Sequence, residues 1–421
     1  MRNRSAARGG PDAAPAAGRR FPRSFEGYGE RGHDGGMLAR MSDATTARAG
    51  RPVEVGPLPE LLTVGVEEEF LLVEPETGRV APAVDEVYRH VPPQLREQVQ
   101  HEYLTTQIEI GSAPVVGLDA LGRSLAALRT ALADAAERAG VRLVAVGTAP
   151  IGGAPPAPIV DNPRFHRMVE RFGALSTDPG LNGLHVHVGI PDRDTGVHVL
   201  NHLRQWMPLF AAAAANSPFF NGQDTGYASW RALLWNMWPS VGPTPYLASA
   251  AEYDETVRRL IDTGAMIDEG QNYWFARLSS HLPTVELRIG DVCPTVDDSI
   301  LLAALARALV ATLLEDVGAG REAPPVPHQL LTAAHWRAAH DGLEGLGVDP
   351  SSGQAVPAWR LMRRLVDMVS PALERHGDLA LVTLLLGRLR AHGCGAARQR
   401  AVAARDGVPA VIPYLAGLTR P

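Results

Sequence analysis

The sequence predicts an α+β protein, in which a mixed sheet of about six strands is covered by helices. From Leu61 onward, short apolar strand-like segments alternate with segments whose apolar residues recur at helical spacing. The last part of the chain is mainly helical in pattern, and no repeat of solenoid period is visible. The 421 residues exceed most single domains, but one large core with peripheral helices accommodates them.

The strands and helices of the first half are expected where apolar patterns meet turn residues. Strands are expected where Val, Ile, Leu and Phe cluster, and helices where leucines recur every three or four residues and a glycine follows. In chain order the expected elements are strand Leu61–Val73, helix Val84–His90, strand Leu104–Ile110, helix Leu118–Ala139, strand Val141–Thr148, a Gly/Pro-rich loop Pro150–Pro163 and strand Asn182–Ile190.

The elements of the second half of the chain are predicted by the same criteria, and those near its end are mainly helices. An ordered, aromatic-rich loop is expected where Trp230, Trp235 and Trp238 lie among Gly, Asn and Pro. The expected elements are helix Val197–Ala215, strands Trp274–Leu278 and Thr284–Ile289, helix Ile300–Leu314, and helices His335–Leu343, Trp359–Val369, Leu379–His392 and Gly395–Arg405.

Residues 1–56 are rich in Gly, Ala, Pro and Arg and have few large apolar residues. Such a segment cannot bury enough surface to offset chain entropy, so we expect a disordered basic tail ahead of one domain at 57–421. No apolar segment follows its arginines, which argues against a secretory signal.

The composition, with 45% hydrophobic and 20% charged residues, is that of an ordinary soluble globular protein. The net charge of -6 gives no reason to expect a nucleic-acid partner. The only cysteines are Cys293 and Cys394, which favours a reducing cytoplasm over a disulfide framework. Charged residues such as Arg204 and Arg307 interrupt the longest apolar stretches, so no membrane span is expected.

Three consecutive carboxylates lie in the segment Gly65-Val66-Glu67-Glu68-Glu69-Phe70, inside an apolar run. Side chains alternate along a strand, so Glu67 and Glu69 should share one face, about 6–7 Å apart, while Glu68 points to the other. Buried carboxylates need compensating cations, and Mg2+ prefers carboxylate oxygens. The segment therefore predicts a metal-holding strand; the alternative is an edge strand with a solvated acidic face.

Four expected strands carry polar residues at positions i and i+2, which would place each pair on one face of the sheet. The pairs are Glu67/Glu69, Gln107/Glu109, His185/His187 and Glu286/Arg288. The histidines could bind a transition metal, donate to phosphate or carboxylate, or be structural. Glu286 and Arg288 could form a buried ion pair, or hold a metal and the phosphate that it neutralises.

Several common nucleotide and hydrolase motifs are missing from the sequence. It contains no P-loop, no complete dinucleotide fingerprint, no Gly-x-Ser-x-Gly elbow and no metal-type cysteine spacing. The acidic strands could still hold two or more Mg2+ ions around a nucleoside triphosphate. The competing hypotheses are a metal-dependent His-x-His hydrolase of the amidohydrolase type, an ATP:guanidino phosphotransferase and a non-catalytic protein with a degenerate site.

Four motifs, in this order and rough spacing, resemble the YbdK-type branch of the glutamate–cysteine ligase type 2 family. They are Val64-Gly65-Val66-Glu67-Glu68-Glu69-Phe70, Gln107-Ile108-Glu109-Ile110, Leu184-His185-Val186-His187-Val188-Gly189 and Thr284-Val285-Glu286-Leu287-Arg288. The resemblance implies a fold like that of glutamine synthetase and guanidino kinases, whose curved, antiparallel-rich sheet binds ATP and Mg2+ on its concave face. It also implies a carboxylate–amine ligase, in which ATP phosphorylates the γ-carboxylate of L-glutamate and an amine, by inheritance L-cysteine, attacks the acyl phosphate.

The resemblance also implies roles for individual residues. Metal ligands would be Glu67, Glu69, Glu109 and Glu286. His187 would contact metal or phosphate with His185 behind it, and Arg288 would clamp phosphate. Arg231 and Arg277 would hold a substrate carboxylate or phosphate. The partners implied are small molecules, and a homodimer is compatible with the relatives.

Overall fold

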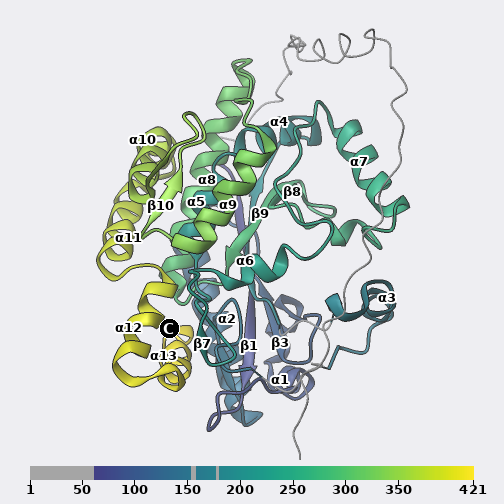
Figure 1. Cartoon of the computed structure of the whole chain (residues 1–421), viewed down its shortest axis with the longest axis vertical. Helices are drawn as coiled ribbons and strands as arrows, with labels where there is room; N and C mark the ends of the chain where they lie inside the picture. The colour runs from purple at the N-terminus through teal and green to yellow at the C-terminus, as the bar shows by residue number, and fades with distance from the viewer. Residues whose placement is uncertain (1–60, 153–157, 177–179) are drawn as a thin grey trace, which may run out of the picture. The chain divides into compact units, whose positions relative to one another are not determined.

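The computed structural model describes residues 61–421 except 153–157 and 177–179 (Figure 1). The expected tail at residues 1–56 and the domain boundary near residue 57 lie outside the described residues. Those that are described belong to one compact unit. Within these ranges, no helix has both the length and the apolar character needed to cross a membrane.

The core of this unit is a seven-stranded sheet. Its strands run in the order β2-β3-β1-β5-β9-β8, and β4 pairs with β1 beside this path. Their bounds are β1 Val64–Val73, β2 Val99–His101, β3 Gln107–Gly111, β4 Arg142–Val144, β5 Gly183–Gly189, β8 Ala276–Leu278 and β9 Thr284–Asp291. All pairings among them are antiparallel.

This arrangement corrects the expectation of a mixed sheet, because alternating strands and helices do not by themselves fix strand direction. It agrees with the antiparallel-rich sheet that the family resemblance implied. The acidic strand β1 lies inside the sheet between β3 and β5, so the edge-strand alternative is wrong.

Most of the expected helices are present. Confirmed helices are α1 Val84–His90, α2 Leu118–Arg138, α8 Val296–Gly318, α10 Ala358–His376, α11 Leu379–His392 and α12 Gly395–Asp406. The expected helix Val197–Ala215 is two helices, α4 Arg193–Leu203 and α5 Met207–Ala214, and α9 spans His328–Asp341 instead of starting at His335. The expected aromatic-rich loop contains the short helix α6 Trp230–Trp235 and the small hairpin β6 Phe219–Phe220 with β7 Gln223–Asp224.

Several elements were not expected from the sequence. The missed elements are β2, α3 Pro163–Phe172, α7 Ala250–Asp262, the hairpin β10 Leu346–Val348 with β11 Ala355–Pro357, and α13 Val411–Thr419. Helix α7, for example, buries only Tyr253 and Val257 among acidic residues and arginines. A helix whose apolar stripe is this narrow gives little periodicity to detect. In Figure 1, α10–α13 lie to the left of the sheet and α3 and α7 to its right.

The two faces of β1 have different chemistry. On one face, Glu68 is fully buried against α2 and α8, where it accepts hydrogen bonds from Arg129 at 2.8 and 2.6 Å and from Ser299 at 2.5 Å. Glu67 and Glu69 point to the other face, as the alternation of the strand predicted. Strand β1 therefore carries a buried ion pair on one face and two carboxylates beside His185 on the other.

Helix α9 carries a buried histidine that should make stability depend on pH. Burial lowers the pKa of His335 to about 3, and its ring packs 4.2 Å from that of Phe275. Because the unfolded chain binds this proton near pH 6.5 and the folded chain does not, stability falls as pH decreases from about 6.5 toward 3. At pH 5 we expect this group to cost about 2 kcal/mol relative to pH 8.

The variant His335→Leu should remove that part of the pH dependence, which urea unfolding at pH 5 and pH 8 measures. The exposed His281, changed to Gln, is the matched control and should leave the difference between the two pH values unchanged. An unaltered difference in His335→Leu would contradict the assignment.

Candidate active site

The register of the antiparallel strands brings the sequence-predicted polar residues into one row across the sheet. Glu69 lies opposite Glu109, and Glu67 lies opposite His185. Beyond them, His187 lies opposite Glu286. Arg277 lies opposite Glu286 on the last strand, so the row crosses five strands, from β3 to β8.

Glu67 lies between the two histidines at the centre of the row. Its carboxylate is 3.0 Å from His185 Nδ1 and 3.3 Å from His187 Nε2. Burial alone would raise the pKa of Glu67, but the hydrogen bonds from both histidines lower it well below the usual range. The same contact raises the pKa of His187 against the effect of its burial.

Two sets of side chains offer ligand atoms that all lie within 4.8 Å of one another. One set is Glu67, Glu109 and His185, and the other is Glu67, His187 and Glu286. The Nε2 atoms of both histidines are buried beside carboxylates: that of His187 lies 3.3 Å from Glu67, and that of His185 lies 3.6 Å from Glu69. Imidazole nitrogens and carboxylate oxygens that converge in this way are the kinds of ligand atom that a cation takes in proteins.

Glu102 is a further site residue that the sequence analysis missed. It follows β2 and lines the same cavity as Glu69 and His185. Burial and the nearby Glu69 raise its pKa to about 7, and burial together with Glu102 raises that of Glu109 well above the usual range. Such crowded carboxylates hold protons unless a cation compensates them. Glu102 was missed because β2 was not recognised as a strand, so its pairing with Gln100 at i, i+2 was not noticed.

Glu286 is held between two guanidinium groups. Its oxygens accept hydrogen bonds from Arg277 Nε at 2.8 Å and Arg288 Nη1 at 2.5 Å. Burial would raise the pKa of Glu286, but the two arginines lower it well below the usual range. The ion-pair alternative for Glu286 and Arg288 is therefore what the structure shows, and it leaves Glu286 beside His187, in reach of a shared cation.

Two more predicted residues have distinct positions. Arg231, from α6, is 3% exposed and stacks its guanidinium 4.9 Å from the ring centre of Trp235. Gln107 lines the same pocket as Glu69 and His185, and its amide donates to the Leu181 carbonyl at 3.0 Å and to Asn182 Oδ1 at 2.9 Å. All residues proposed from sequence as ligands or clamps are thus brought to one face, from β3, β1, β5, β9, β8 and α6.

Two pockets of different character reach the carboxylates and histidines of the row. The aromatic pocket contains Glu69, Glu102 and His185 together with Arg231 and Arg288, and Trp235, Trp238 and Tyr273 form its wall. The apolar slot, of about 390 Å³, contains Glu67 and His187 and is lined by the backbone of Gly65, Gly111 and Gly189. Both pockets therefore reach carboxylates of β1: the aromatic pocket reaches Glu69, and the apolar slot reaches Glu67.

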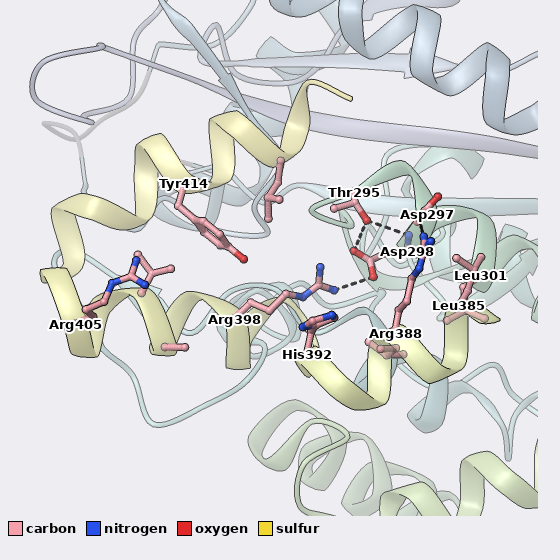
Figure 2. Close-up of a pocket in the computed structure, with 14 residues that line it drawn as sticks. Thr295, Asp297, Asp298, Leu301, Leu385, Arg388, His392, Arg398, Arg405 and Tyr414 are labelled. Carbon is pink, nitrogen blue, oxygen red and sulfur yellow. Dashed lines mark hydrogen bonds and ion pairs between the residues drawn. The ribbon is translucent and has the colours of Figure 1, made fainter. Parts of the chain in front are cut away.

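A third pocket, of about 510 Å³, lies among α8, α11, α12 and α13 (Figure 2). Its cations are already paired: Arg388 with Asp297 at 2.6 Å and Arg398 with Asp298 at 2.7 Å. None of the residues lining it belongs to the carboxylate row. The row is therefore the candidate active site, despite the larger volume of this pocket.

Comparison with known proteins identifies the family of the chain. Residues 63–410 match the model of a family described as "Glutamate-cysteine ligase family 2", a span that includes every residue of the row. The chain belongs to glutamate–cysteine ligase family 2. It is 52% identical over 373 residues to "Putative glutamate–cysteine ligase 2" of Salinispora arenicola, covering 88% of this chain and 98% of that protein. It is also 46% identical over 343 residues to "Putative glutamate–cysteine ligase 2-1" of Saccharopolyspora erythraea, covering 81% and 90%.

Solved structures share the fold of this family 2 member. A glutamate–cysteine ligase from Francisella tularensis in complex with AMP superposes with a TM-score of 0.63 at 12% identity, covering 86% of this chain and 89% of that one. A bifunctional glutathione synthetase from Pasteurella multocida gives 0.59 at 14% identity, covering 86% and 53%. The expected family is therefore confirmed, and the enzyme class is that of carboxylate–amine ligases rather than His-x-His hydrolases.

Proposed function

We propose that this protein is an ATP-dependent ligase that joins the γ-carboxylate of L-glutamate to an amine, with L-cysteine as the first candidate. The products are γ-glutamylcysteine, ADP and phosphate, and the intermediate is an acyl phosphate. The observation that carries the proposal is the row of carboxylates, histidines and arginines between two separate pockets. A ligase of this kind must bring a nucleotide and a carboxylate to one point from two sides.

The carboxylates and histidines of the row fit Mg2+. Glu67, Glu69, Glu109 and Glu286 would hold the ions, and we add to this set Glu102, which lines the same pocket as Glu69. The support is the convergence of Glu67, Glu109 and Glu286 on the two ligand sets and the raised pKa values of the crowded carboxylates Glu102 and Glu109. When bound, Mg2+ neutralises phosphate oxygens during phosphoryl transfer.

We place the nucleotide in the apolar slot. Glycines at Gly65, Gly111 and Gly189 leave the strand backbone bare, so a flat base can approach it closely. His187 lines the slot, where it would donate to a phosphate oxygen. The Francisella tularensis structure, which holds AMP, supports a nucleotide in this fold.

We place the amino-acid substrate in the aromatic pocket. Arg231 and Arg288 both stack on Trp235, at 4.9 and 6.0 Å from its ring centre, so two planar guanidinium groups face one cavity. Such a pair suits a carboxylate, because each guanidinium donates in a fixed fork. Arg288 also contacts Glu286 and is positioned to offset charge on the transferring phosphoryl group.

The setting and assembly of the enzyme are parts of the same proposal. Both cysteines are free and buried, which agrees with a reducing cytoplasm. A homodimer stays a prediction.

The deciding experiment is Mg2+-dependent release of ADP from ATP by the purified protein, with L-glutamate and a panel of amines. We expect release that requires both glutamate and one amine, with L-cysteine the first tested. ADP release with glutamate and a different amine would support the ligase reaction and show that the acceptor is that amine and not L-cysteine. If no carboxylate and amine cause ADP release, the proposal is contradicted and a degenerate site is favoured. Phosphoryl transfer to a guanidino compound would instead identify a phosphotransferase in place of a ligase.

A further inference from the structure

Asp291, the last residue of β9, carries a buried carboxylate that lies outside the row. It is 1% exposed. Its Oδ2 accepts hydrogen bonds from the Asn216 N–H at 2.8 Å and the Ser217 hydroxyl at 2.7 Å, and its Oδ1 accepts one from the Ser229 hydroxyl at 2.8 Å. A buried carboxylate is costly unless donors compensate it, so three donors on one group indicate an arrangement with a purpose.

Asp291 determines how the two serines bond to α6. An ionised carboxylate only accepts, so each hydroxyl points its single proton at Asp291 and keeps its lone pairs for other donors. Ser217 Oγ accepts from the N–H of Arg231 at 3.1 Å, and Ser229 Oγ accepts from the N–H of Ala232 at 3.2 Å. Asp291 thus fixes, through two hydroxyls, the start of the helix that carries Arg231.

The side chain of Arg231 is held from the same direction. Its Nη1 donates to the Ile289 carbonyl at 3.3 Å and lies 3.9 Å from Asp291 Oδ1. A Cβ on Gly183 would lie 2.4 Å from Arg231 Nη2, so β5 is bare where the guanidinium rests. The backbone of Arg231 is therefore held through Ser217, which bonds to Asp291, and its side chain is held by Ile289 and Asp291 at the end of β9.

Helix α12 reaches the same carboxylate through Asn216. Gln399 donates to the Asn216 carbonyl at 3.0 Å and to its Oδ1 at 2.7 Å. The Asn216 amide in turn donates to the carbonyls of Ala145 at 3.0 Å and Val292 at 2.8 Å. The loop that presents Ser217 to Asp291 is thus secured from the C-terminal helices.

We propose that Asp291 is a positioning residue that holds the guanidinium of Arg231 in the aromatic pocket, and that Gln399 supports it through Asn216. The proposal rests on the proposed function, in which Arg231 binds the carboxylate of the amino-acid substrate. Asp291 itself lines neither pocket of the row.

The first test is the isosteric variant Asp291→Asn. The new amide group is itself a hydrogen-bond donor, but the groups around this position are also donors. The hydroxyl of one serine must therefore rotate, and Arg231 loses the negative charge beside it. We expect KM for glutamate to rise about tenfold or more, while kcat and KM for ATP change less than about threefold. A folded variant with unchanged KM for glutamate would overturn the proposal.

A double-mutant cycle separates positioning from a general effect on the fold. If Asp291 acts through Arg231, Asp291→Asn should add nothing to KM for glutamate in an Arg231→Met background. Independent, multiplying effects of the two substitutions would overturn the proposal.

Gln399→Ala extends the test if Asp291→Asn does not fold. We expect a smaller rise in the same KM, about threefold. The matched control is Arg398→Met on the same helix, which breaks the ion pair with Asp298 (Figure 2) and leaves Asn216 untouched. The control should leave KM for glutamate unchanged, and an equal rise in both variants would overturn the proposal.

Failure of the proposed function would be recognised separately. If the wild-type protein releases no ADP with any carboxylate, the proposed function fails, and crystal structures of the wild type and Asp291→Asn decide the positioning role. A guanidinium displaced from the Ile289 carbonyl in the variant supports the role of Asp291. A guanidinium in its wild-type place overturns it.

Discussion

Replacing Glu67 with Gln is expected to reduce Mg2+-dependent ADP release by at least about three orders of magnitude. Glu67 belongs to both sets of ligand atoms and contacts both histidines, so no other carboxylate of the row has the same central position. The amide keeps the shape of the side chain but removes the charge that a divalent cation needs. Loss of several kcal/mol of charge stabilisation in the transition state accounts for an effect of this size.

The fold should survive this substitution. The Glu67 side chain is 34% exposed, and one of its two histidine contacts can be kept by the amide oxygen. Steady-state ADP release and a urea unfolding curve on the same preparation measure the two effects. Glu76→Gln, in the exposed turn after β1, is the matched control and should retain full activity. If Glu67→Gln keeps more than about a tenth of the wild-type turnover, Glu67 is not a ligand of the proposed metal site.

Sequence reasoning succeeded where the side-chain period of a strand carried the information. Glu67, Glu109, His185 and Glu286 were assigned to one face because each belongs to an i, i+2 pair in an apolar strand, and the structure brings all four together. Strand order and direction carry no such local signal. The cross-strand partner of each residue, and therefore the continuous row, became visible only from the register.

The residues that sequence reasoning missed share a different property. Glu102 and Asp291 lie at or just beyond strand ends, where no periodic pattern marks the direction of a side chain. Asp291 matters through contacts with Asn216, Ser217 and Ser229, which lie more than 60 residues away in sequence. Such long-range hydrogen bonds are a property of the packed fold, so local propensity cannot predict them.

Replacing Arg129 with Met is expected to lower the free energy of unfolding by about 3–5 kcal/mol. Arg129 and Glu68 are both fully buried, and Arg129 also donates to the carbonyls of Cys293 at 3.0 Å and Pro294 at 3.2 Å. Removing the guanidinium leaves an uncompensated carboxylate and two unsatisfied carbonyls in the core. Urea unfolding monitored by circular dichroism measures the loss.

Two comparisons show whether this loss comes from the buried charge. In Glu68→Gln/Arg129→Met no net charge remains, so much of the stability should return, because the cost of breaking a buried pair comes mainly from the unpaired partner. Arg258→Met removes an ion pair with Glu255 whose arginine side chain is 59% exposed, and it should cost less than about 1 kcal/mol. Equal losses in Arg258→Met and Arg129→Met would contradict the assignment. Because Glu68 lies between Glu67 and Glu69, this buried pair also fixes which residues of β1 belong to the row.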